Sequence, residues 1–314
     1  MKVFVAGHNG MVGRHVANEI SKSPDYDVLT ADRVDLDLCD RDLTNKYISN
    51  NKPDQIIICA AKVGGILANS SNQYEFLLDN MKIQNNIFEA ARVNDIKKII
   101  FLGSSCIYPK LCPQPIKEEY LLSSSLEETN EGYALAKITG IKLSKALNDQ
   151  YDFDVRALMP TNLYGAYDNF DLKNSHVMPA LIRKFIEARD NQQEAVEIWG
   201  TGRPLREFMH VEDLAGAIKF IMELNKDEYQ KAAYQKVLIN VGSSEETTIE
   251  HLAQIICKET DYRGKTFFNT SYPDGTPRKL MDSSRLESLK WKPKIPLTEG
   301  IRQTIKWYVD YSNS

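Results

Sequence analysis

The run YALAK at positions 133–137 places a tyrosine and a lysine one helical turn apart, on one face of a predicted helix. Tyrosine is a poor acid–base group near neutral pH, because its ordinary pKa is about 10. A nearby lysine ammonium favours the phenolate, so we expect Lys137 to lower the pKa of Tyr133. The pair could then deliver a proton to a substrate oxygen. An exposed helical pair without a function would have the same spacing.

Two serines and a cysteine follow the predicted strand Lys98–Leu102, at the end where a parallel sheet binds ligands. A serine there can hydrogen-bond a reacting oxygen, and spacing alone does not separate Ser104 from Ser105. Cys106 should point the same way as Ser104 if the segment is extended. A thiolate at this place could remove a proton from a carbon, whereas a small buried apolar residue is the alternative interpretation.

Gly7, Gly10 and Gly13 lie between an apolar run, Val3–Ala6, and a helical segment, Met11–Ser21. Glycines at such a turn allow a tight bend and a close approach of the backbone to a pyrophosphate, which the start of the helix can bind. The GxxGxxG spacing is typical of short-chain dehydrogenases and reductases. The loop therefore predicts a dinucleotide site.

Asp32 and Arg33 stand at the end of the second predicted strand, Asp27–Leu29. An acid at this place binds the ribose hydroxyls of NAD, whereas a nearby arginine accepts the 2′-phosphate of NADP. Because both residues are present, the choice of cofactor stays open at this level.

The rest of the first half alternates short apolar runs with helical segments, which indicates an α/β fold with a doubly wound parallel sheet. Regularity weakens after Pro160 and returns near Val211. We expect a nucleotide-binding domain over 1–165 that also receives about 211–242. A smaller α/β substrate domain is expected over 166–210 and 243–314. The further runs are Gln55–Cys59, Asp154–Leu158 and Val237–Val241 for strands, and Tyr74–Val93, Tyr133–Asn148, Met178–Ala188, Val211–Leu224, Ile249–Lys258 and Leu297–Tyr311 for helices.

Composition excludes several classes of protein. The formal net charge of −4 argues against non-specific nucleic-acid binding, which needs a basic stripe. No apolar run approaches the roughly 20 residues of a membrane helix, so we expect a cytoplasmic protein. Five cysteines without a CxxC pair and five histidines without metal-ligand spacing predict neither a disulfide framework nor a metal site.

Eight longer runs carry a resemblance that covers nearly the whole chain. They are AGHNGMVG (6–13), AAKVGGI (60–66), FLGSSCIYPK (101–110), MPTNLYG (159–165), DNFDLKNSHVMPALI (168–182), IWGTGRPLREFMHVEDLA (198–215), INVG (239–242) and PDGTPRKLMD (273–282). With these runs the chain resembles the GDP-L-fucose synthase family of extended short-chain reductases. The resemblance implies a Rossmann fold, NADPH as cofactor and a GDP-4-keto-6-deoxy sugar as substrate.

The same resemblance implies a role for each matching residue. Tyr133 corresponds to the acid that protonates O4 of the sugar, Lys137 to its partner and a ligand of the nicotinamide ribose, and Ser104 to the serine that holds the reacting oxygen. Cys106 and His176 correspond to the pair that epimerises C3 and C5. Together with the glycine loop and the end of the second strand, the candidate cofactor-binding residues are Gly7, Asn9, Gly10, Met11, Val12, Gly13, Asp32, Arg33, Lys137, Pro160, Asn162, Leu163 and His176. The resemblance implies Lys184, Trp199, Arg206 and Lys279 as substrate-binding residues.

Two positions depart from the family pattern. Asn9 stands where some members carry an arginine, which weakens the expectation of a 2′-phosphate contact there. Lys184 stands where arginine is common. A single ammonium group therefore replaces a guanidinium group that could bind a phosphate through two parallel hydrogen bonds.

Two other functions fit the same residues. One is the C4 reduction of another GDP-4-keto sugar, such as a heptose for surface polysaccharide, with little epimerisation. The other, more remote, is a non-catalytic dinucleotide-sensing protein, which would need no proton donor such as Tyr133.

We also expect a homodimer, because Tyr74–Val93 and Tyr133–Asn148 carry more apolar positions than one sheet face should cover, and related reductases pair such helices.

Overall fold

A six-stranded parallel sheet forms the centre of the first half of the chain, with strand order β2-β1-β3-β4-β5-β9. The computed structural model describes residues 1–172, 174–272 and 274–312, so Lys173 and Pro273, which fall in two of the matching runs, lie outside the described residues. The central strands β3 and β4 are buried except for Lys98 and rich in β-branched residues, as in a sheet covered on both faces. The six strands are β1 (Lys2–Ala6), β2 (Asp27–Leu29), β3 (Gln55–Ile58), β4 (Lys98–Leu102), β5 (Asp154–Pro160) and β9 (Leu238–Val241).

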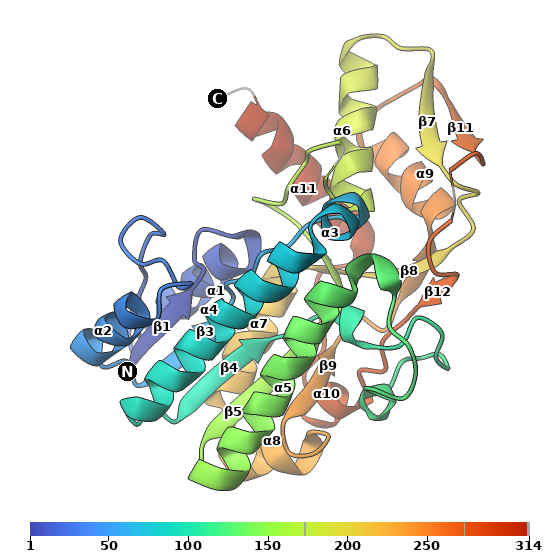
Figure 1. Cartoon of the computed structure of the whole chain (residues 1–314). Helices are drawn as coiled ribbons and strands as arrows, with labels where there is room; N and C mark the ends of the chain where they lie inside the picture. The colour runs from blue at the N-terminus through green and yellow to red at the C-terminus, as the bar shows by residue number, and fades with distance from the viewer. Residues whose placement is uncertain (173, 273, 313–314) are drawn as a thin grey trace.

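Helices cover both faces of this sheet. The helices are α1 (Met11–Ser21), α2 (Arg41–Asn51), α4 (Gln73–Val93), α5 (Glu131–Tyr151) and α7 (Val211–Glu223). Residues of α2, α4 and α5 join one apolar core, and residues of α1 and α7 join a second core on the opposite face. In Figure 1, α4 and α5 run side by side across one face of the sheet. The predicted doubly wound α/β fold is confirmed.

The second half builds a smaller body with its own apolar core. It contains a sheet of β10 (Glu246–Thr248), β8 (Leu205–His210) and β12 (Arg278–Lys279), with β6 (Asn162–Tyr164) also paired to β8. A separate parallel pair is formed by β7 (Ala195–Trp199) and β11 (Lys265–Asn269). The helices α6 (Val177–Asp190), α9 (Ile249–Glu259) and α11 (Leu297–Ser312) pack here, as Figure 1 shows in its upper part.

Several short elements complete the described chain. They are α3 (Ile66–Ser71), α8 (Lys226–Ala232), α10 (Ser284–Ser288) and the 3₁₀ turns η1 (Ser105–Ile107), η2 (Glu118–Tyr120) and η3 (Glu128–Asn130). In the described part of the chain, no helix combines the length and the apolar character that crossing a membrane requires.

The elements that the sequence predicts agree with the structure to within a few residues, but α2, β10 and β11 were not predicted, and two further regions differ. Residues 161–210 contain three strands, β6, β7 and β8, where the sequence predicts mainly irregular chain. The segment after β4 is not extended, because η1 begins at Ser105.

Candidate active site

The glycine loop has the geometry that a dinucleotide requires. Gly7 has φ +89°, and a Cβ there would lie 2.6 Å from the Ala60 backbone. A Cβ at Gly13 would lie 2.1 Å from the Gly7 carbonyl oxygen, so neither position accepts a larger residue. Gly10 caps α1 without a side-chain hydrogen bond, which leaves the N–H groups of Met11 and Val12 free for an anion. This cradle fits a pyrophosphate.

Lys137 is buried beneath the carboxyl end of β4. Its ammonium donates a hydrogen bond of 2.7 Å to the Leu102 carbonyl and lies 4.9 Å from the centre of the Phe101 ring. Burial lowers the pKa of Lys137 to about 8, opposed by a weaker interaction with Cys59. At neutral pH the group is still mostly charged, and it is held at one place.

Tyr133 lies beside Ser104 at the same edge of the sheet. Burial raises the pKa of Tyr133, a charge interaction with Cys106 raises it further, and a hydrogen bond with the Ser104 side chain lowers it. Part of the Tyr133 surface stays accessible, as a group that must meet a substrate requires. Ser105, in contrast, is only 4% exposed. The structure thus brings Ser104 rather than Ser105 to the tyrosine.

The expected effect of Lys137 on Tyr133 is absent. The Lys137 Nζ atom lies 5.9 Å from the centre of the Tyr133 ring and is directed to Leu102. The pKa of Tyr133 is therefore raised by burial instead of lowered by the lysine. A tyrosine with a raised pKa keeps its proton at neutral pH, which suits a proton donor.

Cys106 lies in the 3₁₀ turn η1, so the extended geometry predicted for this segment is wrong. The Ser104 hydroxyl accepts a hydrogen bond of 3.3 Å from the Cys106 N–H, a local contact that turns the chain. Two polar groups reach the sulfur: Asn130 Nδ2 at 3.4 Å and Lys279 Nζ at 3.9 Å. The sulfur therefore faces a polar site and is not an apolar filler.

His176 is the residue directly before α6. Its ring is open to solvent, yet enough protein surrounds it that burial lowers its pKa, and the charge of Lys279 acts in the same direction. Lys279 thus interacts with both Cys106 and His176. One cation therefore acts on both residues that the resemblance implies in epimerisation.

The other predicted substrate residues extend the site along the smaller body. Lys184 Nζ lies 4.8 Å from the centre of the Trp199 ring and donates to the Glu197 carbonyl at 3.2 Å. Arg206 on β8 is paired in register with Lys279 on β12. Burial lowers the pKa of Arg206, opposed by Asp274. The cations Lys184, Arg206 and Lys279 therefore lie along neighbouring elements of this body.

Two functional candidates were missed by the sequence. The Tyr272 ring stacks on Trp199 with centroids 4.4 Å apart and planes 13° apart, which makes an aromatic platform. Glu207 is fully buried and accepts hydrogen bonds from the N–H groups of Ser244 and Met281, which fixes the end of β12 beside Lys279. Each contact joins residues more than 30 positions apart, so no local pattern signals it.

Pro160, Asn162 and Leu163 connect the two bodies. Pro160 ends β5, and β6 begins two residues later and pairs with β8. The Asn162 amide donates a hydrogen bond of 2.8 Å to the Glu207 carbonyl, and Leu163 packs against the core beneath α1 and α7. This segment carries the chain from the carboxyl edge of the large sheet into the smaller body.

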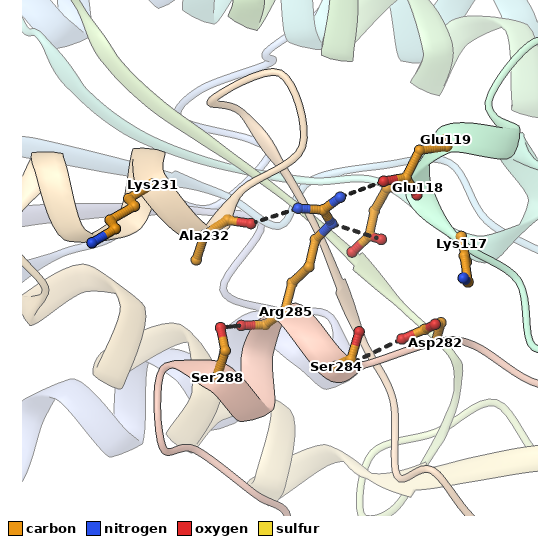
Figure 2. A pocket seen from close by; sticks show the side chains of 9 residues that line it. All are labelled: Lys117, Glu118, Glu119, Lys231, Ala232, Asp282, Ser284, Arg285 and Ser288. Atoms are coloured by element: carbon orange, nitrogen blue, oxygen red, sulfur yellow. Dashed lines mark hydrogen bonds and ion pairs between the residues drawn. The ribbon is translucent and has the colours of Figure 1, made fainter.

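A hollow elsewhere on the surface contains none of these residues. Figure 2 shows that the Arg285 guanidinium fills its middle, where it donates to Glu118, Glu119 and the Ala232 carbonyl. Glu118 is nearly fully buried and its other oxygen accepts from the Asn240 N–H. The hydrogen bonds of Arg285 and Glu118 hold η2, α8, α10 and β9 together, so these charged groups have a structural role.

Comparisons with known proteins agree with the geometry. The model of the NAD dependent epimerase/dehydratase family matches residues 3–242. The GDP-L-fucose synthase of Escherichia coli (strain K12) is 46% identical over 310 residues, 98% of this chain and 97% of that protein. The structure of a GDP-6-OMe-4-keto-L-xylo-heptose reductase from C. jejuni has a TM-score of 0.92 at 32% identity, covering 99% of this chain and 98% of that one. The GDP-mannoheptose C4 reductase MlghC from Campylobacter jejuni with NADP bound has a TM-score of 0.88 at 31% identity, covering 98% of each chain.

Proposed function

The chain belongs to the NAD dependent epimerase/dehydratase family, and within it we propose that it is an NADPH-dependent epimerase and reductase that converts a GDP-4-keto-6-deoxy sugar to GDP-L-fucose. It is an oxidoreductase by family and by its similarity to GDP-L-fucose synthases. NADPH as the cofactor is supported by the similar reductase with NADP bound. The steps below rest on residues of this chain.

Reduction at C4 needs a hydride and a proton. The nicotinamide cofactor, when bound, supplies the hydride. Tyr133 donates its proton to O4, and the raised pKa of Tyr133 keeps this proton in place until it is needed. Ser104, hydrogen-bonded to Tyr133, holds the same oxygen. Lys137, which is held by the Leu102 carbonyl 5.9 Å from the centre of the Tyr133 ring, is assigned to the nicotinamide ribose.

The observation that carries the proposal is the contact of Lys279 with the Cys106 sulfur near Tyr133, together with the effect of the Lys279 charge on His176. The protons at C3 and C5 are acidic because both carbons adjoin the C4 ketone, so a base can remove each one and an acid can return it on the other ring face. Cys106 and His176 are the groups we assign to these transfers. A reductase alone would need no thiol and imidazole around one cation.

The smaller body is proposed to hold the GDP part of the substrate. The stacked Trp199 and Tyr272 rings offer an aromatic surface for a base, and Lys184 and Arg206 offer positive charge for the diphosphate. We therefore assign cofactor binding to 1–165 with about 211–242, and GDP-sugar binding to 166–210 and 243–314.

A second candidate is reduction of another GDP-4-keto sugar without epimerisation. It is favoured by the close structural similarity to the heptose reductase from C. jejuni. A dinucleotide sensor is disfavoured, because Ser104, Tyr133 and Lys137 keep the geometry of a proton-donating site.

We further propose a cytoplasmic homodimer that pairs α4 and α5 with their copies. Tyr74 on α4 is 71% exposed and Leu135 on α5 is 39% exposed, and each would be covered by such pairing. All five cysteines are free thiols, which suits a reducing compartment. Sedimentation of the protein at micromolar concentration tests the dimer, and a monomer there contradicts it.

The function is tested with GDP-4-keto-6-deoxymannose, NADPH and the purified protein. We expect oxidation of NADPH and an NMR spectrum of GDP-L-fucose. A product reduced at C4 but unchanged at C3 and C5 would support the second candidate. Equal turnover of UDP- or dTDP-linked keto sugars would contradict the assignment of GDP.

A further inference from the structure

We propose that Asn130 is a positioning residue for Cys106: its side-chain amide donates a hydrogen bond to the sulfur and stabilises the negative charge that the sulfur must carry to take a proton from the sugar ring. The proposal rests on the epimerase step of the proposed function and deepens it. It adds to that step a residue outside the pair of Cys106 and His176, and one of its tests uses no sugar.

Asn130 reaches Cys106 from a separate element. Cys106 lies in η1, whereas Asn130 ends η3 and is the residue directly before α5. The Asn130 Nδ2 atom donates to the Cys106 sulfur at 3.4 Å, and the Cys106 N–H donates to the Ser104 hydroxyl at 3.3 Å. The cysteine is thus held between its own turn and the start of the helix that carries Tyr133.

The Asn130 side chain gives up the role that its position would ordinarily have. An asparagine directly before a helix usually accepts a hydrogen bond from the N–H of the second or third helical residue. In the described chain Asn130 makes no such bond. Instead, Gln73 Oε1, at the start of α4, accepts from the Gly132 N–H at 3.2 Å. Gln73 therefore caps α5, and the Asn130 amide turns to the sulfur.

The same contact between α4 and α5 fixes the backbone around Asn130. A Cβ at Gly132 would lie 2.6 Å from the Gln73 carbonyl oxygen, so glycine is needed for this close approach. The Gln73 amide donates to the Glu128 carbonyl at 2.8 Å, and the Asn130 N–H donates to the Glu127 carbonyl at 3.1 Å. The end of η3 and the first turn of α5 are therefore held without the Asn130 side chain.

The other polar atom of the Asn130 amide has no partner. Its Oδ1 is buried and accepts no hydrogen bond from any described residue. A buried carbonyl oxygen without a partner costs free energy of folding. An asparagine that served stability alone would be placed to use this oxygen, whereas the contact of Nδ2 with the Cys106 sulfur accounts for the observed orientation.

A hydrogen-bond donor on the sulfur suits the step that we assign to Cys106. The negative sulfur forms an S–H bond with the proton of the ring carbon, and the electron pair of the broken C–H bond moves to the C4 ketone and forms an enolate. A donor that contacts the charged form of a group stabilises that form. Asn130 and Lys279 both act on the sulfur, at 3.4 and 3.9 Å. The amide comes from the large domain and the ammonium from the smaller body.

The first test is alkylation of Cys106 by iodoacetamide at pH 7, read by peptide mass spectrometry on the full chain without ligands. We expect Asn130→Ala to slow the reaction by about tenfold, because a hydrogen bond to a charged group is lost. Asn130→Asp should slow it by about a further tenfold, because a carboxylate repels the negative sulfur. A capping role predicts the opposite order, since aspartate caps a helix as well as asparagine does.

Asn225→Ala is the matched control. Asn225 directly precedes α8, and its side chain does cap, because Oδ1 accepts from the Asp227 N–H at 2.8 Å. This variant should leave the alkylation rate of Cys106 unchanged. An unchanged rate in Asn130→Ala, a rate in Asn130→Asp at or above that of Asn130→Ala, or equal slowing in Asn225→Ala overturns the proposal.

The second test separates epimerisation from reduction in Asn130→Ala. Proton exchange in deuterated water at the ring carbon that Cys106 serves should slow by about tenfold, whereas reduction of a ketone with the final configuration should change by less than about threefold. Asn130 and Tyr133 lie at the same end of α5, so damage to the helix would lower both rates alike, and that result overturns the proposal. Alkylation rates as expected, with no turnover of any GDP-4-keto sugar, would support the role of Asn130 at the sulfur and contradict the proposed function alone.

Discussion

The Lys279 ammonium lies 3.9 Å from the Cys106 sulfur, although 173 residues separate them in the chain. Lys279 comes from β12 of the smaller body and Cys106 from η1 at the edge of the large sheet. A positive charge at this distance attracts a thiolate. The same charge, together with burial, lowers the pKa of His176 and favours its neutral ring. One cation therefore acts on both groups that we assign to epimerisation.

Replacing Lys279 with Met should slow the chemistry of Cys106. Without the ammonium 3.9 Å from the sulfur, we expect alkylation of Cys106 by iodoacetamide at pH 7, read by peptide mass spectrometry, to slow by about tenfold, because the ammonium attracts the negative charge of the attacking sulfur. Lys279→Arg keeps a positive charge and should keep most of the rate. If Cys106 is alkylated equally fast in the Met and Arg variants, the charge of Lys279 does not act on the sulfur, and its role is limited to contact with the substrate.

Tyr133→Phe should separate reduction from epimerisation. The change removes the proton donor and keeps the ring, so hydride transfer to C4 should fall by about two to four orders of magnitude. Exchange of the C3 and C5 protons in deuterated water should continue, because it uses Cys106 and His176. NMR of the recovered sugar measures both. Loss of exchange together with reduction would show that Tyr133 also serves epimerisation.

Cys106→Ser should have the reverse effect. A hydroxyl is far too weak an acid to supply the base at pH 7, so deuterium should no longer enter at the position that Cys106 serves. Reduction of a ketone that already has the final configuration should persist. Exchange at the wild-type rate in this variant would remove Cys106 from the mechanism and leave a structural role.

The sequence predicted the large sheet well because its strands are buried on both faces. Residues 56–58 and 99–102 are continuous apolar runs, and such runs need no distant partner to be recognised. The glycine loop is equally local, since strand, turn and helix follow each other directly. These features are specified within short windows of sequence.

The site was harder to predict because its contacts join distant segments. Strand β8 contains Arg206 and Glu207, and it pairs with β10 and β12, which come about 40 and 70 residues later. Because polar residues interrupt its apolar residues, β8 lacks the continuous apolar run by which the buried strands are recognised. The partners of Cys106 were also unpredictable, and a local hydrogen bond from its N–H to Ser104 replaced the expected extended chain. The sequence offers candidate residues, but only the fold shows which of them lie together.

Arg156→Ala should destabilise the fold strongly. Arg156 makes two hydrogen bonds to Asp154, at 2.9 and 2.7 Å, and donates to the carbonyls of Ile221 and Leu224, with both charged side chains less than 10% exposed. Its loss leaves Asp154 buried without a partner, which costs about 3–5 kcal/mol of unfolding free energy. Urea unfolding measures this difference.

Lys145→Ala is the control for Arg156, because it also breaks a charge pair, with Asp149 on the surface of α5. Exposed pairs of this kind contribute about 0.3–0.5 kcal/mol. A loss for Arg156→Ala no greater than for Lys145→Ala would show that Asp154 finds another partner or takes up a proton at little cost.

Asp168 should make stability depend on pH. Its Oδ1 accepts a hydrogen bond of 2.7 Å from the Asn169 N–H, and its Oδ2 is buried without a hydrogen-bond partner among the described residues. Burial raises the pKa of Asp168 from its ordinary 3.8 to about 7, against the smaller effect of the Asn169 bond. The unfolded chain therefore releases this proton at a lower pH than the folded chain.

It follows that stability contributed by protonated Asp168 is present below pH 4 and is lost as pH rises from about 4 to about 7. Asp168→Asn removes this loss. We expect its unfolding free energy, relative to wild type, to increase between pH 5 and pH 8 by about 1–3 kcal/mol, since each pKa unit corresponds to about 1.4 kcal/mol. Urea unfolding of both proteins at the two pH values measures the change, and all other titrating groups cancel in the comparison. The exposed Asp35→Asn variant should show no comparable increase. A constant difference between Asp168→Asn and wild type at pH 5 and pH 8 would mean that the ionised Asp168 carboxylate reaches water or a cation in the folded protein.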